Sequence, residues 1–164
     1  MHPTASPSRA LFAPAGLMAA IIVVASVAAC EDTTEPGPPT FVASLSGAGE
    51  VPAKAVPGTG TATIVKNGAS YTYTITYTGM SGPLTGAHIH GPASATTNAT
   101  VIVPFSVTGA GASGTLTGTF TSTNTPTISN DSLDVLMRTG GAYVNLHTGA
   151  NVGGEIRGQL SQQP

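Results

Sequence analysis

Residues 59–78 read TGTATIVKNGASYTYTITYT, and their pattern is the clearest indication of the fold class. From residue 71 onward, tyrosine or isoleucine alternates with threonine, which places the two kinds of side chain on opposite faces of an extended strand. Residues 59–65 alternate in a similar way, and the Asn67-Gly68 pair between the two segments is typical of a hairpin turn, for which type I′ is the simplest geometry. Threonine is β-branched and suits a partly exposed pleated surface. We therefore predict an antiparallel hairpin.

The same alternation recurs along the rest of the chain, with Gly- and Pro-containing turns between the segments. One short helix is predicted near 130–138, where Ser129 or Asn130 can cap a stretch with apolar residues on one helical face. The fold class that we predict is all-β, either a two-sheet antiparallel sandwich or a flattened Greek-key barrel. Its strands are expected at 40–46, 59–65, 70–78, 85–91, 100–107, 112–122, 142–147 and 154–160.

Composition excludes several classes of protein. The 164 residues are enough for one domain, and only 7% of them are charged. A formal net charge of −2 gives no basic surface, so we predict that the protein does not bind nucleic acid. The paucity of Lys and Glu argues against a helical bundle. A single cysteine excludes an internal disulfide and a Cys-based zinc finger.

The first thirty residues have the pattern of a secretory signal. Arg9 precedes an apolar run at 17–29, which would span about 20 Å as a helix and so falls short of a ~30 Å hydrocarbon core. The run ends in Val-Ala-Ala-Cys30, which resembles the bacterial lipobox. We predict a lipoprotein signal peptide at 1–29, a lipidated Cys30 with an acidic, Pro-rich tether at 30–39, and a β domain at 40–161. The alternative is an ordinary signal peptide followed by an incidental cysteine.

This interpretation predicts where the protein is found. The lipid at Cys30 would attach it to a membrane without spanning it, on the periplasmic or outer face of a bacterial cell envelope. The membrane is then one expected partner, and an extracellular protein is a second.

Three histidines follow the predicted signal peptide. His88 and His90 are two residues apart in a predicted strand, so their side chains share a face. His147 lies in another predicted strand, and the three imidazoles converge if the two strands are neighbours. A His-x-His pair with a distant histidine is a reasonable ligand set for copper, or alternatively zinc. The alternative is that these histidines only form hydrogen bonds or a surface recognition patch.

Charged residues of the predicted domain that could support a site are few. Arg157 shares a face of the last predicted strand with Glu155. Its guanidinium could tie carbonyls and a carboxylate together, with Glu50 or Glu155 as the partner, or it could guide an anion towards a metal. The sequence has no G-x-S-x-G motif and few aromatic residues for a sugar platform. We therefore predict no catalytic residues.

Four motifs in order resemble the CHRD domain: LSGAGEVP at 45–52, AHIHGP at 87–92, GAYVNLHT at 141–148 and GGEIRGQL at 153–160. The resemblance covers about Phe41 to Leu160 and implies an extracellular β-rich domain. The growth-factor antagonism of chordin, the animal protein that gave the domain its name, is not implied, because chordin's cysteine-rich domains are absent. The function that we expect is a non-enzymatic, membrane-anchored binding or structural module.

A second resemblance concerns the histidines. The order His88, His90, His147 and Arg157 is similar to that in copper/zinc superoxide dismutase. It implies that the three histidines are copper ligands and that Arg157 guides an anionic substrate. The predicted mature chain has no further histidine for a second metal and no disulfide. The alternative functions are therefore a copper- or zinc-binding protein and, ranked below it, a protein with dismutase-like activity.

Overall fold

The computed structural model describes residues 37–121 and 128–164. The predicted signal peptide, Cys30 and most of the predicted tether lie outside the described residues. In the part that is described, no helix is both long enough and apolar enough to cross a membrane. The elements in chain order are β1 (Thr40–Ser46), η1 (Gly47–Gly49), β2 (Thr59–Asn67), β3 (Ser70–Thr78), β4 (Leu84–His90), β5 (Val101–Pro104), β6 (Gly114–Thr121), α1 (Asn130–Arg138), β7 (Tyr143–Thr148), β8 (Ile156–Gln159) and β9 (Ser161–Gln162).

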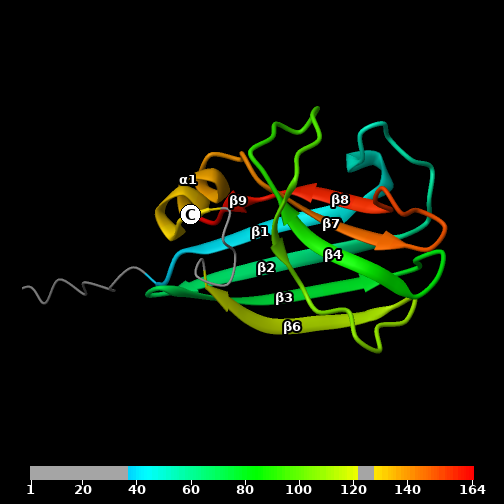
Figure 1. Ribbon diagram of the computed structural model, residues 1–164, viewed down its shortest axis with the longest axis horizontal. Coiled ribbons are helices and arrows are strands. Elements are labelled where there is room, and N and C mark those ends of the chain that lie inside the picture. Colours follow the sequence, from blue (N-terminus) through cyan, green and yellow to red (C-terminus); the bar gives the residue numbers. More distant parts are fainter. Residues whose placement is uncertain (1–36, 122–127) are drawn as a thin grey trace, which may run out of the picture. The chain divides into compact units, whose positions relative to one another are not determined.

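The strands form one antiparallel sheet, nearly closed into a barrel. Their order is β5-β4-β7-β8-β1-β2-β3-β6, with β9 paired to β1. Strands β1, β2, β3 and β6 run side by side, and α1 lies beside β9 (Figure 1). The all-β prediction is confirmed. The sheet is continuous, so the structure matches the barrel alternative and not two separate sheets.

The predicted hairpin is present, but its turn differs from the prediction. Strands β2 and β3 pair without a register shift from Thr59 opposite Thr78 to Asn67 opposite Ser70. The two turn residues are therefore Gly68 and Ala69. Gly68 has φ +61°, whereas no residue other than glycine has a positive φ among those described. Type I′ requires positive φ at both central residues, so the type I′ prediction is wrong; glycine with positive φ at the first central position alone matches the pattern of type II′.

The core fills the interior of the curved sheet. The alternating residues of β3 are buried, and their threonine neighbours are exposed. Helix α1 matches the predicted bounds, and Ser129 is its N-cap, since the Ser129 hydroxyl accepts a hydrogen bond from the backbone N–H of Ser132. Leu133 and Met137 are one turn apart on the helix and are fully buried. The helix therefore adds its apolar face to the core of the sheet.

Two strand predictions differ from the structure. The strand expected at 100–107 is only β5 at 101–104, where Pro104 has no N–H to donate to a neighbouring strand. The strand expected at 154–160 is only β8 at 156–159, and a separate strand, β9, follows at 161–162. Leu160 lies between them, and its N–H bonds to the carbonyl of Ala142. The short β9 then pairs with β1 at Phe41 and Val42, which the sequence pattern did not predict.

Candidate metal centre

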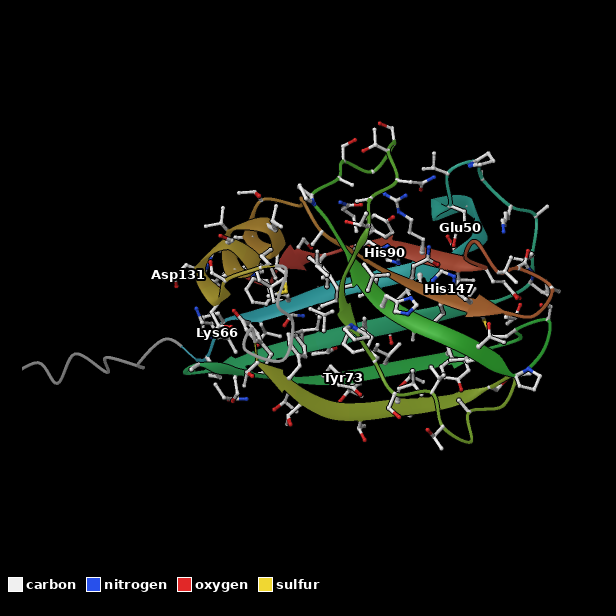
Figure 2. All side chains as sticks on the ribbon, viewed as in Figure 1. Glu50, Lys66, Tyr73, His90, Asp131 and His147 are labelled. Atoms are coloured by element: carbon white, nitrogen blue, oxygen red, sulfur yellow. The ribbon has the colours of Figure 1, made fainter. Side chains whose placement is uncertain are left out.

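Two neighbouring strands bring the three predicted histidines together. Strand β4 pairs antiparallel with β7, so that His88 lies opposite Asn145 and His90 lies opposite Tyr143. Because alternate residues share a face, His147 projects from β7 on the same side as the two histidines of β4. Figure 2 shows His90 and His147 close together, at a distance from Lys66 and Asp131 near α1. One potential ligand atom from each histidine lies within 4.8 Å of the others.

Backbone carbonyl groups fix the tautomers of two of these rings. His90 Nδ1 lies 2.9 Å from the carbonyl oxygen of Ala99, and His147 Nδ1 lies 3.0 Å from that of Val152. A carbonyl only accepts, so each Nδ1 carries the hydrogen and each Nε2 of a neutral ring keeps its lone pair. Buried His90 Nε2 has no hydrogen-bond partner among the described residues. Its lone pair is available to a metal.

The third ring, that of His88, contacts His147 and is partly exposed to solvent. His88 Nδ1 lies 3.1 Å from His147 Nε2, and its side chain is half-buried. Since the Nε2 of His147 is an acceptor, the Nδ1 of His88 donates this hydrogen bond. A metal bound between these two nitrogens would replace that hydrogen. His88 would then carry its hydrogen on Nε2.

Burial keeps all three imidazoles neutral at pH 7. Burial, together with repulsion from the neighbouring His147 and His90, lowers the pKa of His88 to about 4. Burial also lowers the pKa of His90 and of His147, against the opposing effect of their backbone hydrogen bonds. Neutral imidazole is the form that ligates metals, so protons compete weakly for the cluster at neutral pH.

The separation of the three nitrogens suits an ion after a small adjustment. Copper and zinc sites place imidazole nitrogens about 2.0–2.1 Å from the metal, so nitrogens sharing an ion are at most about 4.2 Å apart. The cluster spans up to 4.8 Å. His88 is the least buried of the three rings, so a small rotation of this side chain can bring the three nitrogens within the distance that one ion requires. Three protein ligands would leave a coordination position for water or another ligand.

Arg157 lies beside the cluster and is fully engaged with uncharged groups. Its guanidinium donates to the carbonyl oxygens of Ser94 and Thr97 and to Oδ1 of Asn98, at 2.9, 3.0 and 3.1 Å. Only 1% of Arg157 is exposed, and its Cζ lies 3.5 Å from the centre of the Tyr143 ring. Within the described residues, no ion pair joins Arg157 to either predicted carboxylate. The guanidinium holds the loop between β4 and β5 against the sheet.

Glu50 is buried and forms no ion pair with any residue that the structure describes. Its Oε1 has no hydrogen-bond partner in the described part of the chain. Burial raises the pKa of Glu50, against the charges of Lys54 and Arg157, which lower it. The backbone of Gly154 passes so close that a Cβ there would lie 2.7 Å from Glu50 Oε1 and 2.6 Å from Asn145 Oδ1. Gly154 thus leaves the room in which these two side chains lie.

Glu155 is the most completely hydrogen-bonded carboxylate near the site. Both the backbone N–H and the hydroxyl of Ser81 donate to it, as do the hydroxyl of Thr148 and the Nδ2 of Asn151. Burial raises the pKa of Glu155, but these hydrogen bonds outweigh burial and lower it overall. The carboxylate ties the β3–β4 loop to the end of β7.

Replacing Glu155 with glutamine is expected to destabilise the domain by about 3 kcal/mol, because the new amide group faces donors and leaves some of them unpaired. The pKa of Glu155 is lowered in the folded protein. The carboxylate therefore stabilises the fold fully above its ordinary pKa near 4.5, and this stabilisation is lost as pH falls through its pKa in the folded protein. Urea unfolding of both proteins from pH 7 to pH 3 tests this. The difference in unfolding free energy should be constant above pH 5 and should shrink below pH 4.5. Asp131→Asn, which alters an exposed carboxylate, is the control. An equal loss in both variants contradicts the role of Glu155.

Some contributors to the site were not predicted. The carbonyls of Ala99 and Val152 orient two histidines, yet any residue has a carbonyl, so no sequence signal identifies them. Tyr143 stacks on His90 with ring centres 4.9 Å apart and planes 3° apart. Tyr143 is two residues before Asn145 and four before His147, so strand periodicity places all three side chains on one face of β7. This spacing was the signal in the sequence that could have identified Tyr143 as part of the site.

Comparison with known proteins identifies the family. The family model described as the CHRD domain matches residues 41–160, which include all of β1 except Thr40, the three histidines of the cluster and β8. Comparisons with curated proteins and with solved structures gave no match. The matched segment covers nearly the whole β domain and contains the four motifs that carried the resemblance. The chain therefore belongs to the CHRD domain family.

Proposed function

We propose that this CHRD domain is a metal-binding module that holds one copper or zinc ion through His88, His90 and His147. The observation that carries the proposal is the cluster itself, in which three imidazole nitrogens lie within 4.8 Å. Two of the rings are held by backbone carbonyls with Nε2 unprotonated, and one of these Nε2 atoms is buried without a hydrogen-bond partner in the described structure. An unpaired buried acceptor is costly, and a bound ion would compensate that cost.

Copper(II) is the ion that fits the donor set best. The ligands are all imidazole, which suits copper and zinc, and divalent copper binds nitrogen sites more tightly than zinc does. Three ligands with one side open to solvent suit an ion that is stored, passed on or presented to a further ligand. This proposal agrees with the binding or structural role that membership of the CHRD family suggests.

Equilibrium dialysis against Cu(II) or Zn(II) tests the proposal directly. Residues 37–164 contain every described strand, the helix and the core, so this part of the chain is suited to the measurement. The wild-type domain should retain one equivalent, and Cu(II) should displace Zn(II). The variant with alanine at all three histidines should retain none. Equal retention by the two proteins, or none by either, contradicts a histidine metal site.

We further propose that the domain is attached to the bacterial cell envelope by lipid at Cys30. The apolar run and the lipobox-like Val-Ala-Ala-Cys30 sequence support this, and the acidic, Pro-rich segment that follows would separate the domain from the membrane. An extracellular protein partner is consistent with that position.

Cys30→Ser should abolish attachment of the full chain when it is expressed in a bacterium with lipoprotein processing. A thioether to diacylglycerol needs the cysteine sulfur, so the variant cannot be lipidated. Metabolic labelling with a fatty-acid analogue and membrane fractionation measure the effect. Wild-type protein should carry the label and sediment with membranes, whereas the variant should carry none. Unlabelled wild-type protein contradicts lipidation and leaves the ordinary signal peptide as the explanation.

A further inference from the structure

The surroundings of His90 suggest how its ring is held in the orientation that a metal needs. Strand β7 lies between β4 and β8, with Tyr143 opposite His90 on one side and opposite Gln159 on the other. The His90 ring stacks on the Tyr143 ring almost in parallel. The Arg157 guanidinium, which comes from β8, also lies over the Tyr143 ring. Tyr143 is thus packed between a histidine of the cluster and a buried cation.

A single peptide segment links the same residues by hydrogen bonds. The carbonyl of Ala99 accepts from His90 Nδ1 at 2.9 Å, and the N–H of Ala99 donates to the Tyr143 hydroxyl at 3.1 Å. The peptide groups of Ala99 therefore connect the two side chains, since its N–H bonds to Tyr143 and its carbonyl to His90. Arg157 binds the residues just before Ala99, through the carbonyl of Thr97 and the side chain of Asn98. Tyr143 and Arg157 together therefore hold the Ala99 carbonyl in place.

We propose that Tyr143 is a positioning residue for the metal centre, which fixes the ring plane of His90 by stacking and its Nδ1–H tautomer through Ala99. Tyr143 has no role as a ligand in this arrangement. Arg157 supports it by holding both the Tyr143 ring and the loop that contains Ala99. This inference rests on the proposed metal-binding function, but it concerns a property that the metal-free protein already has.

The physical reason lies in the two tautomers of neutral imidazole. If Nδ1 loses its carbonyl partner, the hydrogen can move to Nε2, and Nε2 then has no lone pair for a metal. Groups that orient metal-ligating histidines typically change metal affinity by about 10- to 100-fold when they are removed. Tyr143 is 2% exposed, so its ring is also held rigidly by the surrounding core.

Nitrogen-15 NMR of the histidine rings tests the proposal without metal. In the full chain, solubilised in detergent, His90 should give the signals of the Nδ1–H tautomer. Tyr143→Leu removes the stacking ring and the hydroxyl, so His90 should populate both tautomers, and Cu(II) affinity should fall at least tenfold. The matched control is Tyr77→Leu, since Tyr77 is also buried but lies on β3 and bonds to Gly111. That variant should leave both readouts unchanged.

Tyr143→Phe is the second variant, and it keeps the ring while removing only the hydroxyl. The Ala99 amide should then exchange its hydrogen at least tenfold faster, and the nitrogen-15 shifts of His90 should change. A folded Tyr143→Leu protein with an unchanged His90 tautomer and copper affinity within twofold of wild type overturns the proposal. If Tyr143→Leu does not fold, unchanged Ala99 exchange and His90 shifts in Tyr143→Phe overturn it. Wild-type protein that binds no copper contradicts the proposed function instead, and the tautomer measurement still decides the role of Tyr143.

Discussion

His147→Ala is expected to abolish stoichiometric copper binding and to lower Cu(II) affinity by at least 100-fold. His147 is central to the cluster because its Nε2 contacts His88, while its Nδ1 is already committed to the Val152 carbonyl. Its removal leaves two imidazoles from one strand, His88 and His90, which cannot enclose an ion. His90→Ala should have an effect of similar size. His88→Ala should have a smaller effect, because His88 is the most exposed of the three and contributes less fixed geometry.

Competition titration with a chromophoric chelator measures these affinities. Circular dichroism of each metal-free variant establishes that the sheet is retained. Lys66→Ala is the control, because Lys66 is near the surface and pairs with Asp134, away from the cluster. Wild-type affinity in a folded His147→Ala protein would show that copper binds elsewhere on the chain.

Arg157→Ala is expected to destabilise the domain by about 4 kcal/mol, the largest stability effect predicted for a single side chain. The substitution removes the hydrogen bonds that a buried charged donor makes to the oxygens of Ser94, Thr97 and Asn98, and hydrogen bonds to a charged group contribute about 1.5–3 kcal/mol each. It also removes the cation from the face of Tyr143, which is worth about 0.5–2 kcal/mol. Arg157→Lys should recover only a small part, because an ammonium group cannot reproduce the planar fork of a guanidinium.

Urea denaturation of metal-free protein measures the effect, and Arg138 is the matched control. Arg138 lies at the exposed end of α1 and pairs with Asp134 four residues earlier, so Arg138→Ala should cost about 0.5 kcal/mol. A loss below 1 kcal/mol for Arg157→Ala would mean that the β4–β5 loop is held by other contacts. If Arg157 instead guided an anion, Arg157→Ala would weaken anion binding at the metal centre and leave the free energy of unfolding unchanged.

The fold could be predicted largely because its signals are local. Alternation in 59–78 specifies a strand pair from neighbouring residues alone, and the spacing of apolar residues specifies α1 in the same way. The turn type was wrong because pairing shifted the loop by one residue, from Asn67-Gly68 to Gly68-Ala69. Strand β9 could not be predicted, since two exposed residues carry no periodicity and their pairing with β1 depends on closure of the sheet.

The candidate site could be predicted in part for a similar reason. Period-two geometry placed His88 and His90 on one face, and the meeting with His147 required only that β4 and β7 be neighbours. The orientation of the rings depends on the carbonyls of Ala99 and Val152. Every residue has a backbone carbonyl, so the amino-acid sequence cannot identify these two. The sequence suggested carbonyls and a carboxylate as partners of Arg157, and the structure shows loop carbonyls and a side-chain amide oxygen.

Electron paramagnetic resonance of the domain loaded with one equivalent of Cu(II) tests the metal centre most directly. Three imidazole ligands predict one saturable copper species with hyperfine coupling to three histidine nitrogens. Selective nitrogen-15 labelling of histidine should alter that coupling, and the variant with alanine at His88, His90 and His147 should show only loosely bound copper. A spectrum that lacks histidine nitrogen coupling, or that is the same in the triple variant, would contradict the assignment of this cluster as a copper site.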